Sequence, residues 1–125
     1  MKNKKSTTNF SVAEECYKDN PKKLELYNKQ REENGFDDTE TWHLDTTFAL
    51  FLLPRLKRFT QVCNSFPNGE TPESYRQKLI FIIKSFEEYY LNENDESTLE
   101  IEKERLQNAK NAVNILAELW FHLWW

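Results

Sequence analysis

Apolar side chains recur every three to four residues along most of this chain, which is the spacing of one face of an α-helix. The pattern predicts a short helix over residues 11–17 and longer helices over about 21–33, 39–64, 72–90 and from 97 towards the C-terminus. Only two glycines occur, and no run of alternating β-branched residues is bounded by turn signals. The sequence therefore predicts an all-α fold.

Capping residues mark where these helices begin and end. The expected starts are the Ser11/Glu14 capping box, the Asn20–Pro21 pair, Asp37 or Asp38, the Thr71–Pro72 pair and the Ser97/Glu100 capping box. Asn34 with Gly35, and the SFPNG segment at 65–69, are typical of turns. Pro54 lies inside the helix over 39–64, where it removes one backbone hydrogen bond, so we expect a kink or a break between Phe51 and Pro54.

The two C-terminal helices carry clear apolar stripes. The expected stripe over 72–90 is Tyr75, Leu79, Ile82, Ile83, Phe86 and Tyr90, and that of the last helix is Leu106, Ala109, Val113, Leu116, Trp120 and Trp124. Three long helices with short connections favour a compact antiparallel bundle, with the short N-terminal helices covering one side. A chain of 125 residues fits one domain, which we place at residues 11–125, after a flexible basic tail at 1–10 that carries three lysines.

The C-terminal seven residues, LWFHLWW, would place apolar side chains around the whole circumference of a helix. They include no Asp, Glu, Lys or Arg. Burial within the monomer is one explanation. The other is an interface with a subunit or partner, because large exposed apolar patches are uncommon on monomers. We favour a homo-oligomer, with interface candidates Phe81, Leu119, Trp120, Phe121, Trp124 and Trp125.

Two groups of charged residues are candidates for ligand binding. Asp45 falls between Trp42 and Ala49 on the expected apolar face, where a carboxylate needs a hydrogen-bond or cationic partner. Arg55, Lys57 and Arg58 follow Pro54 and form a basic cluster that could bind a phosphate or a nucleotide. The alternative for each is structural. Asp45 pairs with Arg, Lys or a helix N-terminus of another element, or is partly exposed, and the basic cluster pairs with acids of the next helix.

The charge balance bears on the class of partner. Lys and Arg number 17 and Asp and Glu number 21, so the net charge is −4, which argues against direct binding of duplex nucleic acid. Eight acids and a single basic residue, Lys103, lie between Glu87 and Glu104. This segment is either a solvated helix end or a surface for a basic partner, with Glu93, Asp95, Glu96 and Glu100 as the candidates that face the partner.

No pattern of catalytic or metal-binding residues emerges. His43 and His122 have no recognised metal-ligand spacing, and the glycines are too few for a phosphate-binding loop. We therefore expect a protein without enzymatic activity, metal or cofactor. Two cysteines, no apolar signal segment and no apolar run of about 20 residues predict a cytoplasmic protein that does not span a membrane.

Four segments together resemble a family of small proteins encoded by tailed bacteriophages. They are DTETWHLD at 38–45, LLPRLKRF at 52–59, LIFIIKSFE at 79–87 and NILAELWFHLWW at 114–125. The resemblance covers residues 36–125. The chain departs from the family at the SFPNGETPES turn, where a Trp-containing acidic stretch is usual, and at Cys63.

The family has no assigned enzyme activity, so the resemblance implies a phage accessory protein in the cytoplasm of an infected bacterium. Combined with the apolar C-terminus, it leads us to expect a protein that binds and inhibits or sequesters a host component of anti-phage defence. The partner would be a host protein or a small nucleotide. The alternative functions are a sponge for a nucleotide signal and a structural or assembly protein of the virion.

Overall fold

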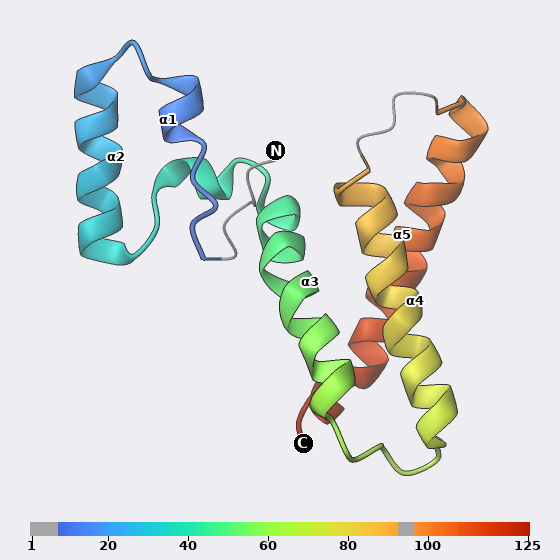
Figure 1. Cartoon of the computed structure of the whole chain (residues 1–125). Coiled ribbons are helices and arrows are strands. Elements are labelled where there is room, and N and C mark those ends of the chain that lie inside the picture. The colour runs from blue at the N-terminus through green and yellow to red at the C-terminus, as the bar shows by residue number, and fades with distance from the viewer. Residues whose placement is uncertain (1–7, 93–96) are drawn as a thin grey trace. The chain divides into compact units, whose positions relative to one another are not determined.

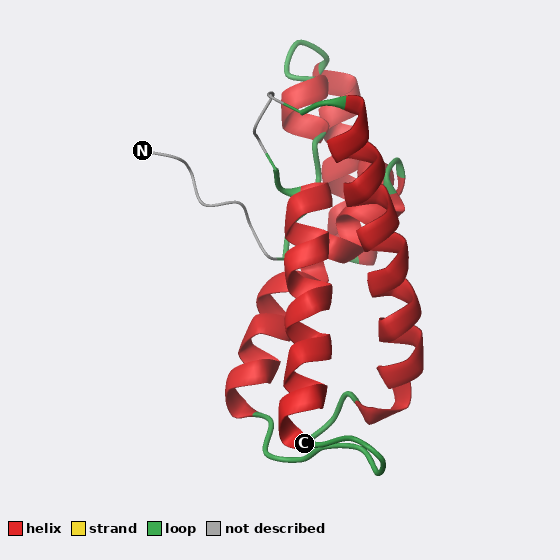
Figure 2. Ribbon diagram, turned by 90° about the vertical axis from the view of Figure 1, so that its right-hand side faces the viewer, coloured by secondary structure: helices red, strands yellow, loops and turns green. Residues whose placement is uncertain are grey.

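The computed structural model describes residues 8–92 and 97–125, and the helices carry most of these residues while no strand occurs among them (Figures 1 and 2). The elements in order are α1 (Ala13–Cys16), α2 (Pro21–Asn34), the 3-10 helix η1 (Asp38–Thr41), α3 (Leu44–Val62), α4 (Pro72–Tyr90), α5 (Leu99–Leu119) and the 3-10 helix η2 (Trp120–His122). The prediction of an all-α fold is confirmed. Most of the expected basic tail, residues 1–7, lies outside the described residues, as do Glu93, Asp95 and Glu96.

The chain divides into two compact units, Met1–Leu52 and Leu53–Trp125, and α3 belongs to both. The single domain over 11–125 stays a prediction.

Local caps set the ends of α2 in the first unit. Asn20 accepts a hydrogen bond from the Lys23 amide at 3.2 Å, Pro21 occupies the first turn, and Gly35 ends the helix in the left-handed conformation at φ 84°. The Tyr17 ring packs against Tyr27 at 5.4 Å and against Trp42 at 6.1 Å between ring centroids. The predicted helix over 21–33 is therefore confirmed, and an aromatic cluster packs beside it.

Two buried carboxylates connect the N-terminal segment to η1. Asp37 is 1% exposed and accepts hydrogen bonds from the Thr39 amide at 2.8 Å and from the hydroxyl of Ser11. Glu40 is 5% exposed; its Oε1 accepts from the Phe10 amide at 3.0 Å, and its Oε2 accepts from the Asp37 amide at 2.7 Å and from Arg31 at 2.8 Å. The fold of this unit thus depends on a polar network as well as on apolar packing.

This network corrects two predicted helix starts. The N-cap of α1 is Val12 and not Ser11, and α1 begins at Ala13. The Ser11 hydroxyl donates to Asp37, and its oxygen accepts from the Ala13 amide at 3.2 Å, not from the amide of Glu14 that a capping box requires. Asp37 and Glu40 form a capping box on η1, so the chain makes a 3-10 turn first and α3 begins at Leu44, five residues after the expected start.

Pro54 lies inside α3, and the helix is continuous from Leu44 to Val62. The expected break between Phe51 and Pro54 therefore does not occur. Ala49, Leu53 and Leu56 of the predicted stripe are buried, whereas Trp42 precedes the helix and is about half exposed.

In the second unit, α4 and α5 form an antiparallel hairpin and lie side by side (Figure 1). Thr71 caps α4 by accepting from the Ser74 amide at 3.0 Å, and Pro72 follows it, as predicted. The expected α4 stripe is buried at Tyr75, Leu79, Ile82, Ile83 and Phe86. Before α4, Glu70 accepts hydrogen bonds from Lys78 and Ser74, which hold the pKa of the Glu70 carboxyl below its usual range.

The face of α5 that packs inward overlaps the predicted stripe in part and is rotated from it. Ala109 and Leu116 of the stripe are buried as predicted, whereas Leu106, Val113 and Trp120 are exposed and Ala112 and Leu119 are buried in their place. Alanines at 109 and 112 permit close approach of a neighbouring helix, so the inward face is the one with small side chains. The N-cap is also one residue later than predicted: Thr98 accepts from the Ile101 amide at 3.2 Å, and Ser97 donates to Glu102 instead.

Candidate functional site

The C-terminal end of the second unit presents four exposed aromatic side chains, which we call the aromatic face. The exposed fractions are 52% for Trp120, 84% for Phe121, 66% for Trp124 and 64% for Trp125. The expected helix through the C-terminus is wrong, because α5 ends at Leu119 and η2 follows. The role of these four exposed residues in an interface stays a prediction.

Two other interface candidates are less accessible. Leu119 is buried against the hairpin at 3% exposure, because the inward face of α5 is rotated from the predicted one, so it belongs to the core. Phe81 on α4 is half-buried. Neither residue extends the aromatic face.

Two hydrogen bonds fix the backbone that carries the aromatic face. The Tyr75 hydroxyl on α4 donates to the His122 carbonyl at 2.8 Å, and the Ser65 hydroxyl in the α3–α4 loop donates to the Trp124 carbonyl at 3.3 Å. His122 therefore contributes its main chain to this arrangement. The aromatic side chains are held on an ordered turn, which reduces the entropy lost when a partner binds.

We expect Tyr75→Phe to lower the free energy of unfolding by about 1 kcal/mol at neutral pH, because the His122 carbonyl loses its donor. Burial, with a smaller contribution from Cys63, raises the pKa of Tyr75 above its ordinary value of 10.0. The native state therefore holds this proton more tightly, and the associated stability is lost as pH rises above 10 through the pKa of the folded protein.

Urea unfolding of both proteins at neutral pH and above pH 10 checks this. The difference in the free energy of unfolding between wild type and Tyr75→Phe should be smaller above pH 10 than at neutral pH. The wild-type protein loses stability as the Tyr75 phenol ionises, and the variant has no phenol at this position. Burial also raises the pKa of Tyr27, but this residue is present in both proteins and contributes equally. A gap that stays constant or widens with pH would contradict the assignment.

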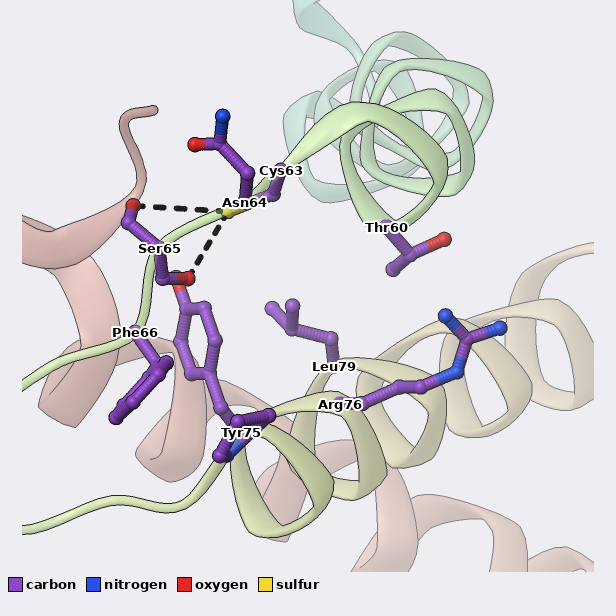
Figure 3. A pocket seen from close by; sticks show the side chains of 9 residues that line it. Thr60, Cys63, Asn64, Ser65, Phe66, Tyr75, Arg76 and Leu79 are labelled. Carbon is purple, nitrogen blue, oxygen red and sulfur yellow. Dashed lines mark hydrogen bonds between the residues drawn. The ribbon is translucent and has the colours of Figure 1, made fainter.

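A pocket of about 240 Å³ lies between the end of α3, the following loop and the start of α4 (Figure 3). Thr60, Cys63, Asn64, Ser65 and Phe66 line it from α3 and the loop. Pro72, Tyr75, Arg76 and Leu79 line it from α4. The Cys63 thiol donates to the Ser65 carbonyl at 3.3 Å. Sequence reasoning missed this pocket, because its two walls are joined by a loop and share no short motif.

The three side chains of the predicted basic cluster, Arg55, Lys57 and Arg58, make separate interactions. The Lys57 ammonium pairs with Glu87 of α4 at 3.1 Å, which is the structural alternative for this residue. The Arg58 guanidinium donates to Gln61 at 3.0 Å, and Arg55 is exposed and has an interaction of its own. An exposed ion pair such as Lys57–Glu87 contributes about 0.2–1 kcal/mol.

Asp45 is exposed, contrary to the prediction that it lies on an apolar face. The reason is the later start of α3 at Leu44, which places Asp45 in the first turn, where free amides and the helix dipole favour a carboxylate. Among the acidic candidates, Glu100 is exposed in the first turn of α5.

Over residues 8–92 and 97–125 no group of three His, Cys, Asp or Glu side chains could hold a metal ion. Within the same ranges no helix has the length and apolar character that crossing a membrane requires. In comparisons with known proteins, no family model matches the chain, and neither a curated protein nor a solved structure shows significant similarity.

Proposed function

We propose that this protein is a non-enzymatic phage accessory protein that binds and inhibits or sequesters a host component of anti-phage defence. The observation that carries the proposal of a host target is the acidic end of the α4–α5 hairpin, where Glu88, Glu100, Glu102 and Glu104 are exposed. The aromatic face, exposed on an ordered turn, carries the proposal of self-association. The resemblance of four segments to small phage proteins gives the setting, the cytoplasm of an infected bacterium.

The aromatic face is large enough to supply binding energy. An aromatic side chain buries about 150–250 Å² when covered, so the exposed fractions of these four leave roughly 400–670 Å² available. At about 25 cal/mol per Å² this corresponds to roughly 10–17 kcal/mol, before a cost of association of about 4–15 kcal/mol. We propose that a second copy of the chain covers this face, so that the protein is a homo-oligomer.

The opposite end of the α4–α5 hairpin supports a second contact, with the target. Figure 1 shows the start of α5 at one end of the hairpin and the C-terminus at the other. Glu88, Glu100, Glu102 and Glu104 are exposed towards the first of these ends. A cluster of exposed negative charges favours a target with a basic surface, including a protein that normally binds nucleic acid.

Phage infection of hosts that carry different defence systems tests the proposal. A phage lacking the gene should plaque poorly on at least one such host, and expression of the wild-type protein should restore plaquing. The variant Glu100→Lys/Glu102→Lys/Glu104→Lys should fail to restore it, whereas the control Glu32→Lys/Glu33→Lys, on exposed α2 positions, should succeed. Equal plaquing with and without the gene on every host would count against the proposal.

A sponge for a nucleotide signal is the second candidate, favoured by the exposure of Arg55 and Arg58 on α3. Calorimetry against cyclic and linear nucleotides separates the two functions. A nucleotide that binds wild type and fails to bind Arg55→Gln/Arg58→Gln would support the sponge. A structural or assembly role in the virion would instead place the protein in purified particles, where mass spectrometry would detect it.

The finer architecture is part of the same proposal. We propose a compact antiparallel bundle of the three long helices, with α3 kinked at Pro54. The amphipathic pattern of these helices supports the bundle, and the backbone hydrogen bond that Pro54 cannot make supports the kink.

A further inference from the structure

We propose that the pocket between α3 and α4 binds a small aromatic anion, with Arg76 binding the anionic group. This site lies within the second unit and is separate from the aromatic face and the acidic end of the hairpin. The inference does not depend on the proposed function, because the pocket's volume, walls and charge carry it.

The volume sets the size of the ligand. A dry cavity of about 150 Å³ accommodates benzene in a well-studied protein. The present pocket, at about 240 Å³, has room for one aromatic ring with a few further atoms. It is smaller than the roughly 300–1,000 Å³ of sites for drug-sized ligands, which argues against a dinucleotide or a larger cofactor.

The walls indicate which part of the ligand lies where. Leu79 and Tyr75 are buried and, with Phe66 and Pro72, supply apolar and aromatic surface for a ring. In the view of Figure 3, Tyr75 and Arg76 lie on opposite sides of Leu79. A ring against Leu79 would therefore reach Tyr75 at one edge and direct a substituent towards Arg76 at the other.

The charge indicates the substituent. Arg76 is the basic residue that lines the pocket, it is exposed, and it makes no ion pair with any residue within 8–92 or 97–125. Among the residues that the structure describes, no acidic side chain lines the pocket. A guanidinium binds a carboxylate or a phosphate through two parallel hydrogen bonds, so the geometry favours a carboxylate or phosphate on the ring.

The pocket shares two residues with the support of the aromatic face. Tyr75 and Ser65 line the pocket, and their hydroxyls donate to the His122 and Trp124 carbonyls. A ligand that contacts these side chains should therefore perturb the C-terminal turn, most directly at the Trp125 amide, which belongs to the same peptide group as the Trp124 carbonyl.

Alkylation of the two cysteines tests the site, with phenylacetate as the probe. Cys63 lines the pocket, whereas Cys16 is exposed in the first unit and serves as an internal control. A ligand of ten non-hydrogen atoms binds with a dissociation constant of about 1 mM, so about 10 mM phenylacetate should slow iodoacetamide alkylation of Cys63 about tenfold. The rate at Cys16 should not change, as peptide mass spectrometry would show.

Two related compounds and two variants make the test specific. Phenylacetamide, which lacks the charge, and acetate, which lacks the ring, should protect Cys63 at most weakly. Phenyl phosphate in the same assay distinguishes a phosphate from a carboxylate ligand. Arg76→Gln should lose protection by phenylacetate, whereas Lys110→Gln, which removes one positive charge from the exposed side of α5, should retain it.

Amide chemical shifts provide an independent readout if Cys63 proves unreactive. Titration with phenylacetate should shift the amides of Ser65, Leu79 and Trp125 in wild type and leave them unshifted in Arg76→Gln. Equal binding of phenylacetate and phenylacetamide, equal protection of both cysteines, or saturating shifts in Arg76→Gln would each overturn the proposal. The absence of both protection and shifts would do so as well.

Discussion

Glu40→Ala should lower the free energy of unfolding by about 3–5 kcal/mol, because it removes a buried carboxylate that accepts from two backbone amides and from Arg31, which is 24% exposed. The Glu40 carboxylate accepts from the Arg31 guanidinium and from the Phe10 and Asp37 amides, and all three donors would lose their acceptor. Asp37 would then remain as a buried carboxylate without its neighbouring capping residue. Chemical denaturation followed by circular dichroism measures the loss.

Two further substitutions define the origin of this effect. Glu40→Gln retains a side-chain oxygen as acceptor but no longer has the negative charge opposite Arg31. It should therefore lower the free energy of unfolding by less than Glu40→Ala does. Glu33→Ala removes an exposed acid of α2 and should change stability by less than about 0.5 kcal/mol. Hydrogen exchange at both the Phe10 and the Asp37 amide should accelerate in Glu40→Ala, because these amides donate to the two different carboxylate oxygens. In Glu40→Gln, which has a single side-chain oxygen, it should accelerate at one of them, and in Glu33→Ala at neither. A stability of Glu40→Ala equal to that of Glu33→Ala would contradict the role of the network.

The second large effect is expected at the aromatic face. Phe121→Ser/Trp124→Ser/Trp125→Ser should weaken self-association at least about a thousandfold, because buried aromatic anchors commonly contribute 2 kcal/mol or more each to an interface. These three side chains are mostly exposed in the single chain, so the variant should keep its helical content. Its unfolding midpoint should match that of the wild-type protein diluted below its dissociation constant, because association stabilises the native state. A series of concentrations in sedimentation velocity gives the change in dissociation constant.

A matched control is available on the same hairpin. Leu99 at the start of α5 is 66% exposed, similar to Trp124, but lies at the opposite end of α5 from the aromatic face. Leu99→Ser should leave self-association unchanged. If Leu99→Ser weakened self-association as much as the triple substitution, the interface would extend along the whole of α5 and would not be confined to the aromatic face.

Features set by neighbours in sequence were predictable. Asn20 before Pro21 and Thr71 before Pro72 cap the helices where expected, because a cap requires only a side chain and an amide two or three residues later. The exposure of the C-terminal aromatics was predictable in the same way, since seven successive residues without Lys, Arg or acids leave more apolar surface than one helix face can bury.

Features set by packing between distant residues were not predictable. The register of α5 depends on close packing at Ala109 and Ala112. The predicted stripe included Ala109 and missed Ala112, because the larger residues at 106, 113 and 120 placed the centre of the stripe further round the helix. Glu40 has capping-box spacing from Asp37, which is a local signal, but its bonds to Phe10 and Arg31 join residues 30 and 9 positions away. The pocket at Cys63 and Arg76 likewise depends on two elements that meet across a loop.

The mass of the intact protein in solution tests the central claim, that the aromatic face is covered by a second copy. Light scattering at about 50 µM, well above a dissociation constant of about 1 µM, should give at least twice the 15.1 kDa mass of the chain. The Phe121→Ser/Trp124→Ser/Trp125→Ser variant should give the mass of the monomer under the same conditions. A monomeric mass for the intact protein would contradict the claim and would leave the aromatic face for the target alone.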